Sequence, residues 1–323
     1  MQEIIQPIER AFLKKELTPE KRLRRTNKSD NEIYIVTSED APYTMLEIGR
    51  LREIVFRYYG GGTGVEVDID RFDTMKSAYR QLIVWSPRDE QILGGYRFLC
   101  GSDVKFDSDG KPMLTSSHLF NFSDVFLKDY LPHTVELGRA FVTLDYQITR
   151  GRSQGLFILD NLWDGLGALT VIDPMLKYFY GKVTMFNTYD PQARNMILYF
   201  LNLHFPDPDG LVTPIRPLRA EINTDRMQTL FLYDNLKDNY KVLNRQVRKL
   251  GVNIPPLVNA YLSLSPKMRV FGTAINEEFG DVEETGILIA VDEILEEKKK
   301  RHIETYLAEM EEPDFRPLKI AYD

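Results

Sequence analysis

A glutamate lies in the middle of an otherwise apolar stretch, residues 134–143, which has the composition of a β-strand. A carboxylate is costly to bury there unless it is paired or functional, so Glu136 either forms an ion pair or takes part in chemistry. The candidate partners are Arg52 and Arg97, and Arg97 also lies in an apolar strand, where an arginine needs a carboxylate. Gly138 favours a bulge or a close approach of another backbone.

Three carboxylates, Asp68, Asp70 and Asp73, have the spacing of the oxygen ligands that open a calcium loop. Such a loop would carry glycine at its sixth position and glutamate at its twelfth, but Asp73 and Tyr79 stand there, so the calcium hypothesis fails. The four histidines also lack the spacing of metal ligands, and we expect no metal. The triple is then either a solvated acidic turn or the carboxylate partner of Arg97.

Two glycine-based cofactor motifs are missing from the chain. The glycine-rich run at residues 60–64 lacks the Lys-Ser/Thr ending and the preceding strand of a phosphate-binding loop, which favours a flexible loop. No dinucleotide fingerprint follows the first expected strand, residues 32–37, which argues against a Rossmann dehydrogenase. We expect no bound cofactor.

Composition narrows the class of protein further. The chain has 323 residues, 43% of them hydrophobic and 28% charged, with a net charge of −7, which argues against a dedicated nucleic-acid binder. We found neither an apolar run long enough for a transmembrane helix nor a signal peptide. The single cysteine, Cys100, cannot form an intramolecular disulfide, and together these features favour a cytoplasmic protein.

These residues must be positioned by alternating strands and helices. Hydrophobic periodicity predicts strands at residues 32–37, 79–85, 91–100, 134–143, 182–188, 268–275 and 285–292, and helices at residues 1–13, 42–59, 123–127, 153–171, 191–203, 226–250, 255–264 and 293–312. This order predicts an α/β or α+β fold, a mixed central sheet flanked by helices. We divide it into an amphipathic, basic N-terminal arm (1–30), a main domain (31–292) with an insertion near 204–225, and a C-terminal helical extension (293–323).

A family resemblance follows from several of these residues together. The pattern Arg52-x-x-x-Phe56, Asp68-x-Asp70-x-x-Asp73, Gly95-x-Arg97 and Glu136-x-x-Arg139-x-Phe141-Val142 resembles the acyl-homoserine-lactone synthases. Those enzymes have a GNAT-like fold and take acyl chains from acyl carrier protein. One departure is Asp68, where that family usually has glutamate.

The chain is more similar to a sister group, the "hemolysin-like" N-acyltransferases of ornithine-lipid and glycine-lipid synthesis. The matching segments are Val135-Glu136-Leu137-Gly138-Arg139, Leu162-Trp163-Asp164-Gly165-Leu166, Pro255-Pro256-Leu257-Val258-x-x-Tyr261-Leu262 and residues 275–279. Residues 4–12 and 24–31 resemble the glycine-lipid branch. The resemblance implies transfer of a fatty acyl group, 3-hydroxylated or not, from acyl carrier protein, or from acyl-CoA, to the amine of glycine or, second, ornithine, as the first step of aminolipid synthesis.

The resemblance also implies roles for individual residues. Glu136 would be the general base, Gly138 would mark the oxyanion site, and Arg139 would hold the acceptor or the acidic network. That network would comprise Arg52, Asp68, Asp70, Asp73 and Arg97. The segment Arg150-Gly151-Arg152-Ser153-Gln154-Gly155 lies where GNAT enzymes bind a pyrophosphate, so Arg150, Arg152 and Gly155 would hold the phosphate of phosphopantetheine.

Two further predictions concern the acyl chain and its carrier. Leu162, Trp163, Leu166 and Phe186 are candidates for an acyl tunnel, although core packing explains each of them equally well. The basic residues between Lys14 and Lys28, with Arg150, Arg152 and Arg194, are candidates for docking the acidic carrier protein. The N-terminal stretch is alternatively a solvated arm, or a peripheral contact with an anionic membrane.

Two competing functions stay open at the level of sequence. An acyl-homoserine-lactone-type synthase would use S-adenosylmethionine, and the long C-terminal third disfavours it. A non-enzymatic, membrane-active protein would fit the amphipathic N-terminus, but no array of lytic amphipathic helices is present.

Overall fold

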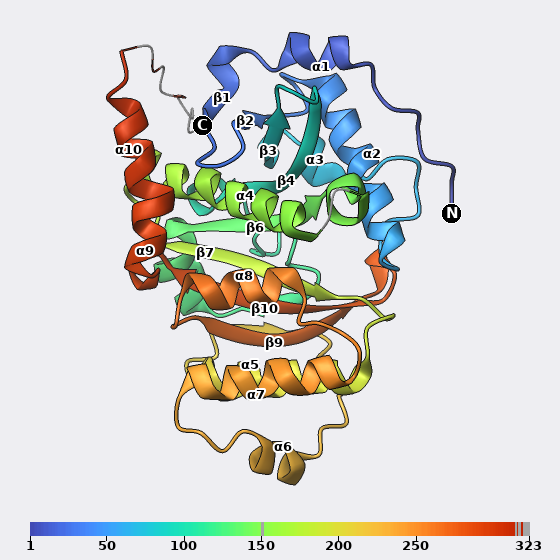
Figure 1. Cartoon of the computed structure of the whole chain (residues 1–323), viewed down its shortest axis with the longest axis vertical. Coiled ribbons are helices and arrows are strands. Elements are labelled where there is room, and N and C mark those ends of the chain that lie inside the picture. The colour runs from blue at the N-terminus through green and yellow to red at the C-terminus, as the bar shows by residue number, and fades with distance from the viewer. Residues whose placement is uncertain (150–151, 314, 316–317, 319–323) are drawn as a thin grey trace.

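The computed structural model describes residues 1–149, 152–313, 315 and 318. Within these residues the centre is an eight-stranded sheet in the order β1-β2-β3-β4-β6-β7-β10-β9 (Figure 1). The neighbours β6 and β7 run parallel, and the other neighbouring pairs are antiparallel. The predicted mixed sheet with flanking helices is therefore confirmed.

The strands follow the apolar runs of the sequence. Their bounds are β1 (Arg22–Arg25), β2 (Glu32–Val36), β3 (Arg80–Ser86), β4 (Gln91–Cys100), β6 (Thr134–Val142), β7 (Tyr178–Met185), β9 (Arg269–Asn276) and β10 (Val282–Ala290), with β5 (Phe120–Phe122) and β8 (Val212–Pro214) in a separate two-stranded sheet. The prediction placed β7 too late, at residues 182–188, and β10 too late, at 285–292. Strand β1 was not predicted, and it adds part of the N-terminal segment to the edge of the main sheet.

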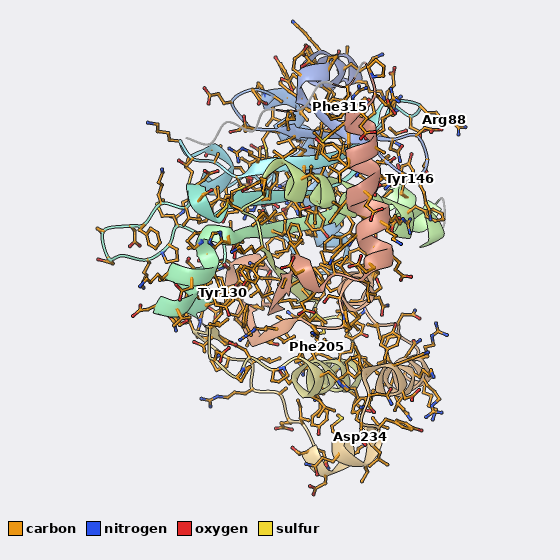
Figure 2. All side chains as sticks on the ribbon, turned by 90° about the vertical axis from the view of Figure 1, so that its left-hand side faces the viewer. Arg88, Tyr130, Tyr146, Phe205, Asp234 and Phe315 are labelled. Atoms are coloured by element: carbon orange, nitrogen blue, oxygen red, sulfur yellow. The ribbon has the colours of Figure 1, made fainter. Side chains whose placement is uncertain are left out.

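Helices cover both faces of the sheet. They are α1 (Arg10–Glu16), α2 (Pro42–Tyr58), α3 (Arg71–Thr74), α4 (Arg152–Ile172), α5 (Pro191–His204), α6 (Thr224–Leu230), α7 (Leu236–Lys249), α8 (Pro256–Leu264), α9 (Glu296–Lys299) and α10 (Thr305–Met310). None of the described helices is both long and apolar enough to cross a membrane. In Figure 2, Asp234, in the linker after α6, lies at the end of the molecule opposite Arg88 and Phe315.

Alternation along the strands divides the core. Leu82 and Phe98 face one side, where they join a hydrophobic cluster with residues of α4, α5, α7 and α8. Ile83 faces the other side and packs with residues of α1 and α2. Farther along that second side, Leu99 and Tyr180 join a third cluster, which includes β5 and β8. The site described below lies where these clusters meet the central strands.

The first predicted helix, residues 1–13, is wrong over most of its length. Residues 1–9 are not helical, because Pro7 limits helix formation and the backbone pairs with a loop instead: Gln2 N–H donates to Gly64 O (2.8 Å) and Ile5 N–H donates to Glu66 O (3.1 Å). The helix that does form, α1, begins only at Arg10.

The single long helix predicted at residues 226–250 is also wrong. It is interrupted between α6 and α7, where the side chain of Asn235 accepts a hydrogen bond from Asp238 N–H (2.9 Å) and so caps a new helix. The predicted short helix at 123–127 instead forms a wide helical turn at Phe126–Tyr130. The predicted helix 293–312 begins at Glu296 and contains a similar wide turn at Lys300–Glu304.

Candidate active site

The parallel strands β6 and β7 separate soon after they begin. They pair only from Thr134 to Glu136, opposite Tyr178 to Tyr180. Beyond this point a cavity of about 380 Å³, here called the apolar cavity, is lined by residues of both strands. Its apolar side chains include Val55, Phe56, Phe141, Leu159, Met185, Phe186, Leu257 and Phe279. Its volume is in the range of small-molecule sites.

The bulge that Gly138 favoured is present in β6. The pairing of β4 with β6 passes from Gly95 opposite Phe141 to Arg97 opposite Gly138, so β6 carries one extra residue. Arg139 lies within this bulge with a φ of 50°, in the left-handed region that non-glycine residues rarely adopt. The distorted backbone places Arg139 in the lining of the apolar cavity.

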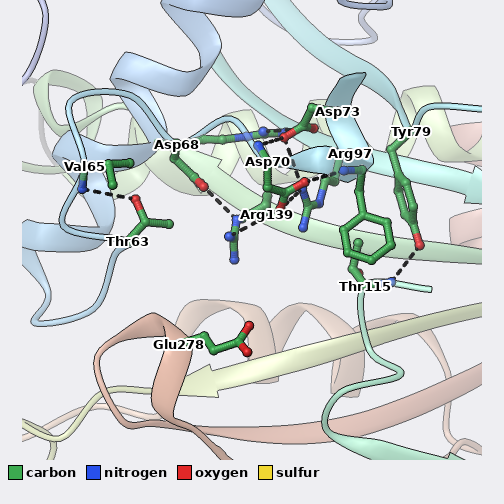
Figure 3. Close-up of polar contacts among 12 residues, drawn as sticks. Thr63, Val65, Asp68, Asp70, Asp73, Tyr79, Arg97, Thr115, Arg139 and Glu278 are labelled. Atoms are coloured by element: carbon green, nitrogen blue, oxygen red, sulfur yellow. Dashed lines mark hydrogen bonds and ion pairs between the residues drawn. The ribbon is translucent and has the colours of Figure 1, made fainter. Parts of the chain in front are cut away.

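The three aspartates meet three arginines beside this bulge, and Figure 3 labels two of these arginines, Arg97 and Arg139. Arg97 Nη1 lies 2.7 Å from Asp70 Oδ2 and 3.2 Å from Asp73 Oδ2. Arg139 Nε lies 2.9 Å from Asp68 Oδ2, and Arg52 Nη1 lies 3.5 Å from Asp73 Oδ1. The structure thus brings together all five residues of the predicted ion network. Arg139, which was expected to hold either the acceptor or this network, pairs with the network.

Local structure explains the spacing of the aspartates. The Asp70 side chain accepts a hydrogen bond from Phe72 N–H (2.8 Å), and Asp73 accepts one from Asp70 N–H (3.1 Å), which is a capping box at the start of α3. Burial alone would raise the pKa of Asp73, but the charges of Arg52 and Arg97 outweigh it and lower that pKa. Asp73 is therefore a carboxylate at neutral pH, and it lies between the guanidinium groups of Arg52 and Arg97.

Glu136 does not pair with Arg52 or Arg97, the partners suggested by the sequence. In the β4–β6 register Arg97 lies opposite Gly138, and both arginines are held by aspartates instead. The Glu136 carboxylate accepts hydrogen bonds from the backbone N–H groups of Thr115 (3.2 Å) and Ser116 (3.1 Å), and from the hydroxyls of Ser116 and Tyr79. It is 2% exposed and lines neither of the cavities described here.

A second cavity of about 660 Å³ lies next to the first, and because its lining is the more polar of the two it is here called the polar cavity. Its lining includes the charged or polar residues Thr63, Asp70, Arg71, Asp107, Lys111, Ser117, His118, Asn276 and Glu278. Five residues line both cavities and form the wall between them: Arg97, Thr115, Arg139, Lys182 and Phe279. An apolar and a polar compartment therefore meet at the bulge of β6.

Comparison with known proteins decides the family. A family model described as an acetyltransferase (GNAT) domain matches residues 51–154. Two proteins named glycine N(alpha)-acyltransferase, from Phocaeicola vulgatus and Bacteroides thetaiotaomicron, are each 64% identical over 307 residues, which covers 95% of this chain and 94% and 91% of those proteins. The chain belongs to the glycine N(alpha)-acyltransferase family. A crystal structure of the AHL synthase LasI also matches, with 17% identity, a TM-score of 0.30 and coverage of 48% of this chain and 73% of that one.

Of the four residues predicted to form an acyl tunnel, one lines the apolar cavity of the acyltransferase. Phe186 lines the apolar cavity, whereas Leu162, Trp163 and Leu166 belong to the hydrophobic core beneath α4. Of the predicted phosphate-binding residues, Arg150 lies outside the described residues, and Arg152 and Gly155 lie in the first turn of α4.

Most of the basic residues predicted to dock a carrier protein already have acidic partners. Lys14 pairs with Glu90 (2.6 Å), Arg22 with Glu32 (2.9 Å), and Arg194 with Glu283. Arg24 is buried and holds the C-terminal segment. Docking at these residues stays a prediction.

Sequence reasoning missed one charged pair in the acyltransferase. Lys182 of β7 and Glu284 of β10 lie on adjacent strands, and both line the apolar cavity. Their strands were predicted, but no local pattern indicates that these two side chains meet, because they come from distant parts of the chain.

Proposed function

We propose that this acyltransferase moves a fatty acyl group from the thioester of acyl carrier protein to the amine of glycine, as the first step of aminolipid synthesis. The observation that carries the proposal is the shared wall between the two cavities, which lets an apolar donor and a polar acceptor approach the same point. The names of the two 64% identical relatives support glycine over ornithine as acceptor.

The donor would occupy the apolar cavity. Its thioester would lie at the bulge of β6, with the acyl chain among side chains such as Phe141 and Phe186. A bulge leaves one residue outside the hydrogen-bond ladder, so a backbone N–H next to Gly138 is the proposed donor to the developing oxyanion. The N-terminus of α4, with Arg152 and Gly155, would attract the phosphate of phosphopantetheine.

The acceptor would enter through the polar cavity and must lose a proton, since an ammonium has no lone pair for attack. Glu136 is the proposed base. Because Glu136 lines neither cavity, the proton would travel through an intervening water. Thr115 marks the place for that water, since its backbone N–H donates to Glu136 and the residue lines both cavities. The amine nitrogen then bonds to the thioester carbon and the C–S bond breaks. The nitrogen loses a second proton as the amide forms, so that one of its two protons reaches the departing sulfur, which leaves as the thiol, and the other passes to solvent.

The test is mass spectrometry of products formed from 3-hydroxyacyl carrier protein and an equimolar mixture of amino acids. We expect N-acylglycine as the main product, and a loss of about 10²-fold or more in rate for Glu136→Gln. Glu90→Gln, a change at an exposed carboxylate, is the matched control and should act like the parent.

Three results would change the conclusion. N-acylornithine as the main product would show that the acceptor is ornithine and not glycine. No product at all, with a donor that another enzyme accepts, would overturn the proposal. Membrane lysis that survives in Glu136→Gln would favour a membrane-active protein instead.

A further inference from the structure

A buried ion pair lies at the wall between the two cavities, and the roles proposed above do not use it. Lys182 Nζ lies 2.8 Å from Glu284 Oε2, and the two side chains are only 11% and 5% exposed. A buried ion pair is often no more stabilising than apolar residues of similar volume. Stability alone therefore gives little reason for placing Lys182 and Glu284 here.

The two members of the pair face different compartments. Lys182 lines both the apolar and the polar cavity, whereas Glu284 lines only the apolar one. Among the described residues that line the apolar cavity, Glu284 is the one carboxylate. Lys182 thus presents its positive charge to both cavities, and Glu284 adds a negative charge on the donor side alone.

Both side chains retain unused hydrogen-bonding capacity. Glu284 Oε2 is occupied by Lys182, but Oε1 has only a 3.5 Å contact with Thr184 Oγ1. An ammonium has three donors, so Lys182 can hold Glu284 and a second anion together. Arg97 and Arg139, the other two cations of the shared wall, are held by the three aspartates.

We infer that Lys182 and Glu284 bind the acceptor as a zwitterion, with Lys182 on its carboxylate and Glu284 on its ammonium. This inference rests on the proposed function and assigns its acceptor subsite to a small α-amino acid. The order of charges along the wall fixes the direction of binding: the carboxylate stays toward the polar cavity and the nitrogen points into the apolar cavity, where the thioester would lie.

The experiment compares glycine with glycinamide, which has the amine but no carboxylate. We expect kcat/KM for glycine to exceed that for glycinamide in the parent enzyme, and the ratio to fall at least tenfold in Lys182→Met, through KM for glycine. KM for the acyl donor should not change. Lys241→Met removes a lysine of the exposed pair with Asp238 (2.7 Å) and should keep the parent ratio.

Lys182→Met leaves a buried carboxylate unpaired and could therefore prevent folding. Two further variants test the inference without leaving an unpaired charge. The double variant Lys182→Met with Glu284→Gln removes both charges and should also lose the preference for glycine. The variant Lys182→Glu with Glu284→Lys keeps the ion pair but exchanges the positions of its two charges. It should fold, and its kcat/KM for glycine should be at least tenfold below that of the parent.

The possible outcomes separate the two proposals. This inference alone would be overturned if the parent enzyme acylates glycine but a folded Lys182 variant, single or double, keeps the parent's ratio of kcat/KM for glycine to kcat/KM for glycinamide. A parent enzyme that acylates no amino acid with a competent donor would overturn the proposed function, and this subsite with it.

Discussion

Arg139 Nε lies 2.9 Å from Asp68 Oδ2, and this ion pair joins the bulge of strand β6 to the loop that precedes α3. Asp68 is fully buried, and Arg139 adopts a φ of 50° at the position where the pair forms. The ion pair with the buried carboxylate of Asp68 therefore stabilises Arg139 in an unfavourable, left-handed backbone conformation. The same bulge forms the wall between the two cavities, so the pair also fixes the shape of the site.

This relationship predicts an unusual order of stability at position 139. Arg139→Ala should destabilise the protein by about 3–5 kcal/mol, because it leaves Asp68 buried without its partner. Arg139→Gly loses the same pair but relieves the left-handed backbone, and should be about 1 kcal/mol more stable than the alanine variant. Glycine is normally the less stable of the two within a strand, so equal or inverted values in urea denaturation would contradict this account.

The buried network also predicts how stability depends on pH. The pKa of Asp73 is lower in the folded protein than its unfolded value of about 3.9, since Arg52 and Arg97 outweigh the effect of burial. Its contribution is thus fully present above the unfolded pKa and is lost as the pH falls through the folded pKa. Unfolding free energies measured from about pH 6 down to about pH 2 should fall less steeply for Asp73→Asn than for the parent. Parallel curves would show that Asp73 does not titrate in this way.

A separate prediction concerns Arg24, which ties the two ends of the chain to α4. Its guanidinium donates to Asp164 O (3.1 Å), His302 O (2.9 Å) and Thr305 Oγ1 (3.0 Å). Arg24→Met should destabilise the protein by about 3 kcal/mol, since it leaves buried acceptors unpaired. The neighbouring Arg25→Met, at an exposed position, should change stability by less than about 0.5 kcal/mol. Equal midpoints of thermal unfolding for both variants would exclude this role for Arg24.

The strands could be predicted because their apolar runs are long and continuous. The ion network could be predicted because its aspartates and arginines resemble the pattern of a known family, whereas the capping box that spaces Asp70 and Asp73 was seen only in the structure. The break in the predicted helix 226–250 could not, because apolar periodicity continues across it and one residue, Asn235, decides where the new helix starts. Strand β1 was missed because its arginines resemble a solvated arm, although Arg24 is buried.

The residues predicted to form an acyl tunnel show what hydrophobic periodicity cannot specify. The spacing of Leu162, Trp163 and Leu166 predicted burial, and all three are buried, but periodicity does not say which surface a helix faces. The pair of Lys182 with Glu284 depends on the register of β7 against β10, which no local pattern specifies.

The length of the acyl chain provides the last prediction. Ala140 lines the apolar cavity from the bulge of β6, so Ala140→Phe should fill part of the space available to the chain. We expect kcat/KM for a 16-carbon donor to fall at least tenfold and that for a 4-carbon donor to change much less, because each excluded methylene forfeits about 0.8 kcal/mol of burial. Leu162→Ala is the matched comparison: it removes a core side chain, should cost about 2–5 kcal/mol of stability, and should leave the chain-length preference unchanged. A shifted preference in Leu162→Ala with none in Ala140→Phe would place the acyl chain beneath α4 instead of between β6 and β7.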